Sequence, residues 1–192
     1  MKNRLRETWN SGKPALNGWL GIPSTFSAEI MSKQDFDSIT IDLQHGLTDY
    51  SIAVPMMQAM SASDATMLCR VPWLEAGIIM KLLDAGAMGI ICPMINSGKE
   101  AEEFVGATRY APLGYRSSGP VRAGIIYPDY HNQANDQIIS MAMIETEEAV
   151  TNAEEICATP GLTGIYVGPS DLAISMGCLL YTSDAADEVD RG

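Results

Sequence analysis

Residues 141–145 read Met-Ala-Met-Ile-Glu, and residues 164–171 read Gly-Ile-Tyr-Val-Gly-Pro-Ser-Asp. Each stretch is an apolar run that leads into a carboxylate, Glu145 in the first and Asp171 in the second. Such an acid lies at the carboxyl end of a buried strand, and parallel strands bring these ends to one edge of a sheet. We expect the two acids to converge on one divalent cation, because hard cations such as Mg²⁺ or Mn²⁺ prefer carboxylate oxygens and water. Co²⁺ is a further candidate.

Short apolar runs alternate with amphipathic stretches along most of the chain. The expected strands cover residues 18–22, 37–42, 66–71, 88–94, 141–145 and 163–168. The runs lack polar alternation, which is typical of parallel strands covered on both faces. No Gly-x-Gly-x-x-Gly follows the first run and no Walker loop occurs, which disfavours an open nucleotide-binding sheet. We therefore expect an α/β fold, a (β/α)8 TIM barrel of which about six of the eight strands are present.

Two earlier strands also end in polar residues. One runs into Asp42-Leu43-Gln44-His45 and the other into Arg70. His45 is a candidate base and Arg70 a candidate clamp for an anion, since histidine titrates near neutral pH and arginine keeps its charge. Asp42 is a candidate partner of the histidine. No lysine ends an expected strand, which argues against Schiff-base chemistry on a carbonyl substrate.

Each assignment has a structural alternative. Glu145 and Asp171 could cap the helices that follow them, His45 could serve a turn, and Arg70 could form an ordinary salt bridge. The Gly/Pro-rich segment 109–136 is either a loop that lines an anion pocket through Arg116 and residues 117–119 or a solvated connection.

Composition narrows the function classes. The chain has 192 residues, 46% hydrophobic, which suits one globular domain. The net charge of −12 argues against nucleic-acid binding through a basic face. The sequence shows neither a signal peptide nor an 18-residue apolar stretch, so we expect a cytoplasmic protein without a membrane span. The four cysteines lack Cys-x-x-Cys spacing, and Cys69 and Cys92 lie in apolar runs, which predicts buried core residues.

The end of the chain differs from the rest. Residues 178–192 have no clear strand or helix period and resemble the translation of a sequencing adapter. We expect residues 1–177 to form a partial TIM-barrel domain and residues 178–192 to be a non-native tail, with a genuine acidic tail as the alternative. A barrel that lacks two strands is expected to be inactive.

Several short motifs lie between Gly18 and Gly177. Their order and spacing together resemble those of a known protein family. They are Asp42-Leu43-Gln44-His45-Gly46, Arg70-Val71-Pro72-Trp73, Leu83-Asp84-Ala85-Gly86-Ala87, Cys92-Pro93-Met94, Pro112-Leu113-Gly114-Tyr115-Arg116, Met143-Ile144-Glu145-Thr146 and Gly168-Pro169-Ser170-Asp171-Leu172. With these motifs the chain resembles the metal-dependent HpcH/HpaI aldolases, which are class II pyruvate aldolases.

The resemblance implies roles for matching positions. Glu145 and Asp171 match the metal carboxylates, His45 the catalytic base, and Arg70 the arginine that stabilises the transition state. Asp84 matches an acid that raises the basicity of the histidine. It ends a helix pattern, so the topology is expected to place it at the edge of the barrel opposite the site.

Further positions are implied to contact the substrate. These are Arg70, Ser170, Asp171 and Met143. Ser170 matches a position whose backbone contacts the substrate, and Met143 stands where relatives often have glutamine. Gln44 also departs from the family, which commonly has glutamate there. Both departures affect which substrate fits.

The resemblance implies a carbon–carbon lyase that cleaves a small 4-hydroxy-2-oxo acid to pyruvate and an aldehyde, in aromatic or sugar-acid catabolism. Family members are oligomers, so a homo-oligomer is expected of the full-length protein. The alternatives are a biosynthetic, citrate-synthase-like carbon–carbon bond formation and a non-catalytic oligomerisation or binding protein on the same barrel.

Overall fold

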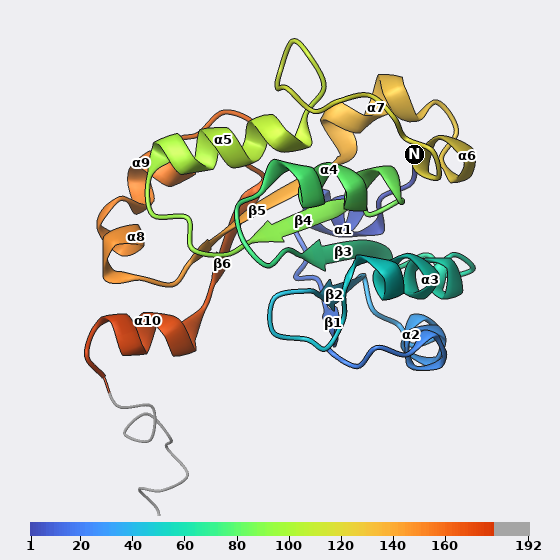
Figure 1. Ribbon diagram of the computed structural model, residues 1–192, viewed down its shortest axis with the longest axis horizontal. Coiled ribbons are helices and arrows are strands. Elements are labelled where there is room, and N and C mark those ends of the chain that lie inside the picture. The colour runs from blue at the N-terminus through green and yellow to red at the C-terminus, as the bar shows by residue number, and fades with distance from the viewer. Residues whose placement is uncertain (179–192) are drawn as a thin grey trace, which may run out of the picture.

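Six parallel strands form one curled sheet in the computed structural model, which describes residues 1–178 (Figure 1). The strands are β1 Asn17–Leu20, β2 Ser38–Asp42, β3 Thr66–Arg70, β4 Gly89–Cys92, β5 Ile139–Ile144 and β6 Gly164–Val167. They pair in sequence order, each parallel to the next, which is the order found in a (β/α)8 barrel. The six expected strands are confirmed, and the described sheet is a half-barrel that leaves β1 and β6 at its edges.

Helices follow the strands and cover the outer face of the sheet (Figure 1). They are α2 Thr25–Ser32, α3 Tyr50–Met60, α4 Ala76–Asp84, α5 Gly98–Thr108, α8 Glu147–Thr151 and α9 Ala153–Cys157. Ser24, Asp49, Ser97 and Thr146 begin four of them as N-caps whose side chains accept a backbone N–H of the first turn. Such caps satisfy donors that the helix leaves unpaired, which fixes where each helix begins.

The large apolar core lies between the sheet and these helices. Ile39 and Ile41 of β2, Leu82 of α4 and Phe104 of α5 are fully buried there. Cys69 and Cys92 are buried in the same layer as predicted, and burial raises the pKa of Cys69 to about 12.

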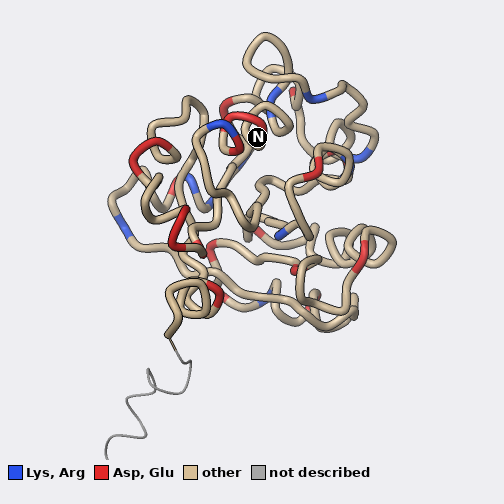
Figure 2. The backbone as a smooth tube through the Cα atoms, turned by 60° about the vertical axis from the view of Figure 1, so that its left-hand side comes forward, with Lys and Arg blue, Asp and Glu red and all other residues tan. Residues whose placement is uncertain are grey.

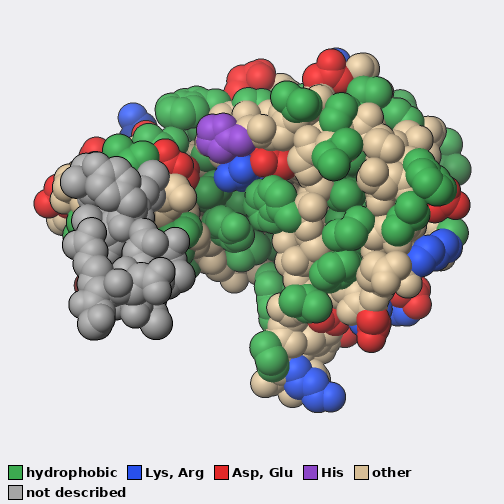
Figure 3. Space-filling view, turned by 90° about the horizontal axis from the view of Figure 1, so that it is seen from below, with side chains coloured by type: hydrophobic (Ala, Val, Ile, Leu, Met, Phe, Trp, Pro, Cys, Tyr) green, Lys and Arg blue, Asp and Glu red, His purple; other side chains and the backbone are tan. Residues whose placement is uncertain are grey.

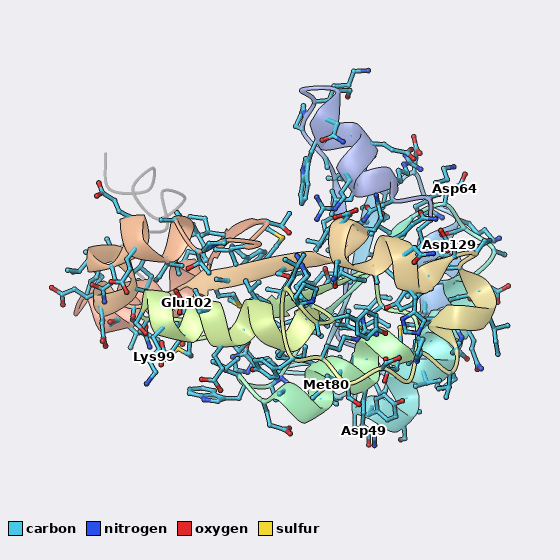
Figure 4. The ribbon with its side chains drawn as sticks, turned by 90° about the horizontal axis from the view of Figure 1, so that it is seen from above. Asp49, Asp64, Met80, Lys99, Glu102 and Asp129 are labelled. Atoms are coloured by element: carbon cyan, nitrogen blue, oxygen red, sulfur yellow. The ribbon has the colours of Figure 1, made fainter. Side chains whose placement is uncertain are left out.

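Polar residues cover the outer sides of the helices. Lys99 and Glu102 of α5 are exposed and lie on the outer surface, as does Asp129 (Figure 4). Lys, Arg, Asp and Glu positions are distributed along the whole described backbone (Figure 2). Helix α5 is thus amphipathic, with Phe104 inside and its charges outside.

The inner face of the sheet is more polar than the outer face, and the apolar cluster on it is small. Only Leu5, Leu68 and Ile139 form a buried apolar cluster on this side of the described chain. Leu5 belongs to α1 Arg4–Asn10, which closes the amino-terminal end of the half-barrel. The Leu5 N–H donates to Thr66 Oγ1, at the start of β3, at 3.0 Å.

Segment 109–136 is not the irregular loop expected from its Gly and Pro content. It contains α6 Ala123–Ile126 and most of α7 Tyr130–Gln137. Tyr130 and Ala134 of α7 are buried in the outer core, and this burial stabilises a helix whose other residues are polar. His131, by contrast, is exposed on this helix.

The last described strand is open to solvent. Ile165 and Val167 of β6 are 37% and 52% exposed. The Tyr166 ring lies 5.7 Å from the Trp19 ring of β1, so the two edge strands touch through an aromatic pair.

Among the described residues no helix has the length and apolarity needed to cross a membrane. All but the first residue of the segment predicted to be non-native lies outside the described part of the chain.

Candidate active site at the carboxyl ends of the strands

Asp42 and Arg70 end neighbouring strands and are partners in the sheet register. The Arg70 guanidinium donates to both Asp42 oxygens, from Nε at 2.9 Å and from Nη2 at 2.6 Å. Trp19 of β1 donates from Nε1 to the same carboxylate at 3.3 Å, and its ring lies 5.0 Å from the guanidinium carbon. The salt-bridge alternative for Arg70 is therefore real, but the pair lies on the concave side of the sheet rather than on the outer surface.

His45 lies in the turn that follows β2, and its side chain is exposed. Its backbone N–H donates to Asp42 Oδ1 at 3.3 Å. The turn folds back tightly at Gly46, where a Cβ would lie 2.3 Å from the Asp42 carbonyl oxygen. Only glycine fits this approach, which is a requirement that the sequence reasoning missed although Gly46 stood in its motif.

Glu145 follows β5 and is 1% exposed. Its Oε1 accepts the Met94 N–H at 2.7 Å, and Met94 has a positive φ of 55°, a conformation rare for residues other than glycine. Burial raises the pKa of Glu145 and the charge of Asp171 raises it further, while the Met94 N–H lowers it. The charges of Arg70 and His45 also lower this pKa.

Asp171 is in the first turn of α10 Pro169–Ser175 and is exposed, as is Ser170 beside it. The turn before this helix approaches Glu145 closely. A Cβ on Gly168 would lie 2.6 Å from Glu145 Oε2 and 3.2 Å from Met143 Cε. Met143 itself is 1% exposed. Gly168 was not singled out from the sequence, although the Gly-Pro-Ser-Asp motif contains it.

Side chains of the expected types gather on this side of the molecule. Figure 3 shows a hollow lined by hydrophobic side chains, with a histidine, a basic and an acidic side chain together at one end of it. Glu145 and Asp171 are the two carboxylates expected from the sequence to bind a divalent cation, and that assignment stays a prediction. No cluster of three or more His, Cys, Asp or Glu side chains suited to a metal occurs in residues 1–178.

Asp84 lies apart from these residues. It ends α4, and its Oδ1 accepts Arg116 Nη2 at 2.7 Å. Arg116 is buried, with its guanidinium carbon 4.5 Å from the Tyr110 ring and 5.4 Å from the Tyr130 ring. The topology expected from the sequence, with Asp84 at the amino-terminal edge, matches this place at the end of α4. Its role beside a histidine stays a prediction, and Arg116 binds this acid rather than lining an open anion pocket.

Comparisons with known proteins agree with the arrangement. The pattern of the HpcH/HpaI aldolase/citrate lyase family matches residues 18–189. A hydroxypyruvate/pyruvate aldolase of Rhizorhabdus wittichii is 43% identical over 176 residues, which are 91% of this chain and 70% of the relative. A 4-hydroxy-2-oxo-heptane-1,7-dioate aldolase of Salmonella paratyphi C is 35% identical over 181 residues, 92% of this chain and 69% of the relative.

A solved structure has the same fold. The crystal structure of a family member from Burkholderia cenocepacia superposes with a TM-score of 0.87 at 30% identity, and the match covers 97% of this chain and 77% of that one. The family match spans residues 18–189, and the structural match covers nearly the whole chain. The chain therefore belongs to the HpcH/HpaI aldolase/citrate lyase family.

Proposed function

We propose that this protein is a metal-dependent pyruvate aldolase that cleaves a 4-hydroxy-2-oxo acid to pyruvate and an aldehyde. The observation that carries the proposal is the arrangement at the carboxyl ends of the strands. Glu145 is buried after β5 with the Gly168 turn that leads to Asp171 packed against it, and Arg70 and the His45 turn are both bonded to Asp42 at the end of β2. Relatives named as aldolases for pyruvate, hydroxypyruvate and a 4-hydroxy-2-oxo diacid support the same chemistry.

Glu145 and Asp171 are the proposed metal ligands. The donor set is made of carboxylate oxygens without cysteine, which favours Mg²⁺ or Mn²⁺, with Co²⁺ third. A divalent cation bound there would supply a Lewis acid for the 2-oxo group of the substrate. The raised pKa of Glu145 fits a buried carboxylate that a cation would stabilise in its charged form.

Arg70 and His45 carry the remaining steps of the proposed reaction. Cleavage of the C3–C4 bond places negative charge on the C2 oxygen of the departing enolate, and Arg70 offers a fixed, permanently charged donor to that oxygen. His45 takes the proton from the C4 hydroxyl, directly or through a water. Ser170 would contact the substrate carboxylate through its backbone, and buried Met143 would shape the floor of the site.

The protein is also proposed to work as a closed (β/α)8 barrel within a homo-oligomer. The exposed β6 residues Ile165 and Val167 share one apolar face of the edge strand, which further elements of a closed barrel would cover. This matters for the assay. Activity is therefore measured on two proteins. One is the 192-residue chain, and the other is a chimera in which the matching part of the Rhizorhabdus wittichii relative replaces the residues after Gly177.

The test is exchange of the pyruvate methyl protons in D₂O, followed by ¹H NMR, together with pyruvate release from a 4-hydroxy-2-oxo acid. We expect exchange and cleavage with Mg²⁺ or Mn²⁺, neither after chelation, and loss of cleavage in His45→Ala while Mn²⁺ still binds. A chimera that folds and binds Mn²⁺ but does not exchange pyruvate protons would be a binding protein. Condensation of pyruvate-like donors without cleavage would instead favour a biosynthetic enzyme.

A further inference from the structure

The Asp42 carboxylate accepts five hydrogen bonds. Oδ1 accepts Arg70 Nε at 2.9 Å, the Gln44 N–H at 3.0 Å and the His45 N–H at 3.3 Å. Oδ2 accepts Arg70 Nη2 at 2.6 Å and Trp19 Nε1 at 3.3 Å. A carboxylate has about four lone-pair sites, so no acceptor site of Asp42 remains for a substrate or for a histidine ring.

Two of these bonds hold the Arg70 fork. A bidentate pair fixes both the position and the plane of a guanidinium, and the Trp19 ring lies against it at 5.0 Å. The Arg70 side chain is only 12% exposed. Because Nε and Nη2 face Asp42, Nη1 is the nitrogen of the guanidinium that this carboxylate leaves free.

We propose that Asp42 is a positioning residue that sets Arg70 and the turn of His45 in one geometry, and that it exchanges no proton with the substrate. This inference rests on the proposed aldolase function and replaces the alternative in which Asp42 is the partner of the His45 imidazole. The observed link to His45 runs through its backbone N–H and not through its ring.

The protonation state of Asp42 agrees with this role. Burial raises its pKa, but the hydrogen bonds from Arg70 and from the Gln44 and His45 N–H groups outweigh burial and leave the pKa below its usual range. An ionised carboxylate with every acceptor site used has no proton to donate and no site at which to accept one. It can only orient its donors.

The first test reads the Arg70 Nε–H directly by ¹H–¹⁵N NMR on the 192-residue chain without substrate, with Arg70→Lys to assign the signal. We expect a slowly exchanging Nε–H in the wild type and fast exchange in Asp42→Asn. Asp49→Asn is the matched control, because Asp49 is an exposed acid that caps α3 nearby and asparagine caps equally well. An Nε–H that exchanges equally in wild type and Asp42→Asn would overturn the proposal. If Asp42→Asn does not fold, Asp42→Glu is measured instead.

The second test is a pair of double-mutant cycles on pyruvate proton exchange in the chimera. Asp42→Asn alone should lower exchange on the order of 10²-fold, as expected when a catalytic group is misplaced by about 1 Å. Added to Arg70→Ala, it should cause a much smaller further loss, because the part of its effect that passes through Arg70 is already gone and only the part that passes through the His45 turn remains.

The cycles separate the rival roles. Losses that add with Arg70→Ala but not with His45→Ala would make Asp42 the partner of the histidine. Losses that add in both cycles, with a lowered melting temperature, would make Asp42 only structural. Absence of exchange in the wild-type chimera would contradict the aldolase function, while the Arg70 signal would still decide whether Asp42 holds the guanidinium.

Discussion

Asp37 directly precedes β2 and Asp42 ends it, and hydrogen bonds hold the pKa of each below its usual range. Asp37 accepts the Leu16 N–H at 2.9 Å, Thr8 Oγ1 at 2.9 Å and Arg4 Nε at 3.2 Å. Its partners thus tie α1 to the amino-terminal end of the sheet. Asp42 accepts Arg70 and Trp19 at the carboxyl-terminal end, on the concave side.

The two acids have the same chemistry and differ in what their arginine can reach. Arg4 bonds Asp35 as well as Asp37, so its donors are directed to the chain's own carboxylates. Arg70 has one carboxylate partner and lies within electrostatic reach of Glu145. An acid–arginine pair therefore indicates a functional site only when it lies at the end of the sheet where other strands also deliver polar groups.

The largest expected difference comes from removing each arginine. Arg70→Ala should lower pyruvate proton exchange by about 10²–10³-fold, the usual cost of losing one donor to a developing oxyanion. Arg4→Ala should leave exchange unchanged and lower the free energy of unfolding by at most about 1 kcal/mol, since its ion pairs are partly exposed. Exchange in the chimera and urea melts measure both. Equal loss of exchange in the two variants would contradict the assignment of a functional role to the Asp42–Arg70 pair and a structural role to the Asp37–Arg4 pair.

A second comparison uses two glycines at opposite ends of β6. Gly168→Ala would place a Cβ 2.6 Å from Glu145 Oε2, whereas a Cβ on Gly164 meets nothing within 4 Å. Gly168→Ala should weaken Mn²⁺ binding about 10–100-fold, the range found when a group that orients a metal ligand is disturbed. Gly164→Ala should bind as the wild type does. Titrations followed by EPR of free Mn²⁺ measure the affinity. Unchanged Mn²⁺ binding in Gly168→Ala would show that Glu145 is not a ligand of the metal.

The smallest effect concerns acid stability. Both aspartates have lowered pKa values, so each contributes stability that is present above the unfolded-state pKa, near pH 4, and is lost as the pH falls through the folded-state value. Asp37→Asn and Asp42→Asn should each flatten the decline of the unfolding free energy below about pH 4. Urea melts between pH 2 and 6 measure the slope. Only Asp42→Asn should also reduce pyruvate proton exchange at neutral pH. A steeper decline of the unfolding free energy below about pH 4 in either variant would contradict the assigned hydrogen bonds.

Sequence patterns were sufficient for the strands, their order and the buried cysteines, because parallel strands covered on both faces leave unmistakable apolar runs. They were insufficient for α7, whose polar sequence is held by buried Tyr130 and Ala134. They also did not reveal the role of Asp42, since the donors that fill its acceptor sites come from Trp19 on one neighbouring strand and Arg70 on the other. Local spacing suggested His45, three residues away, as its partner.

The positive φ of Met94 was equally hidden. It aims a backbone N–H at Glu145 from another strand's loop, 51 residues earlier in the chain. The roles of strand-end side chains can be predicted from the sequence where those residues belong to a recognisable motif. The backbone groups and glycines that orient these side chains cannot, because they depend on contacts between segments that are distant in the chain.

The most direct test of the central claim is a crystal structure of the chimera grown with Mn²⁺, using the anomalous signal of the metal. A divalent cation held by Glu145 and Asp171 requires metal–oxygen distances of roughly 2.0–2.6 Å, so the two carboxylates should come within about 5 Å of one another. We predict a single anomalous peak between them that disappears in Glu145→Gln. Carboxylates more than about 9 Å apart, too far for one ion with such bonds, or a peak elsewhere, would contradict it.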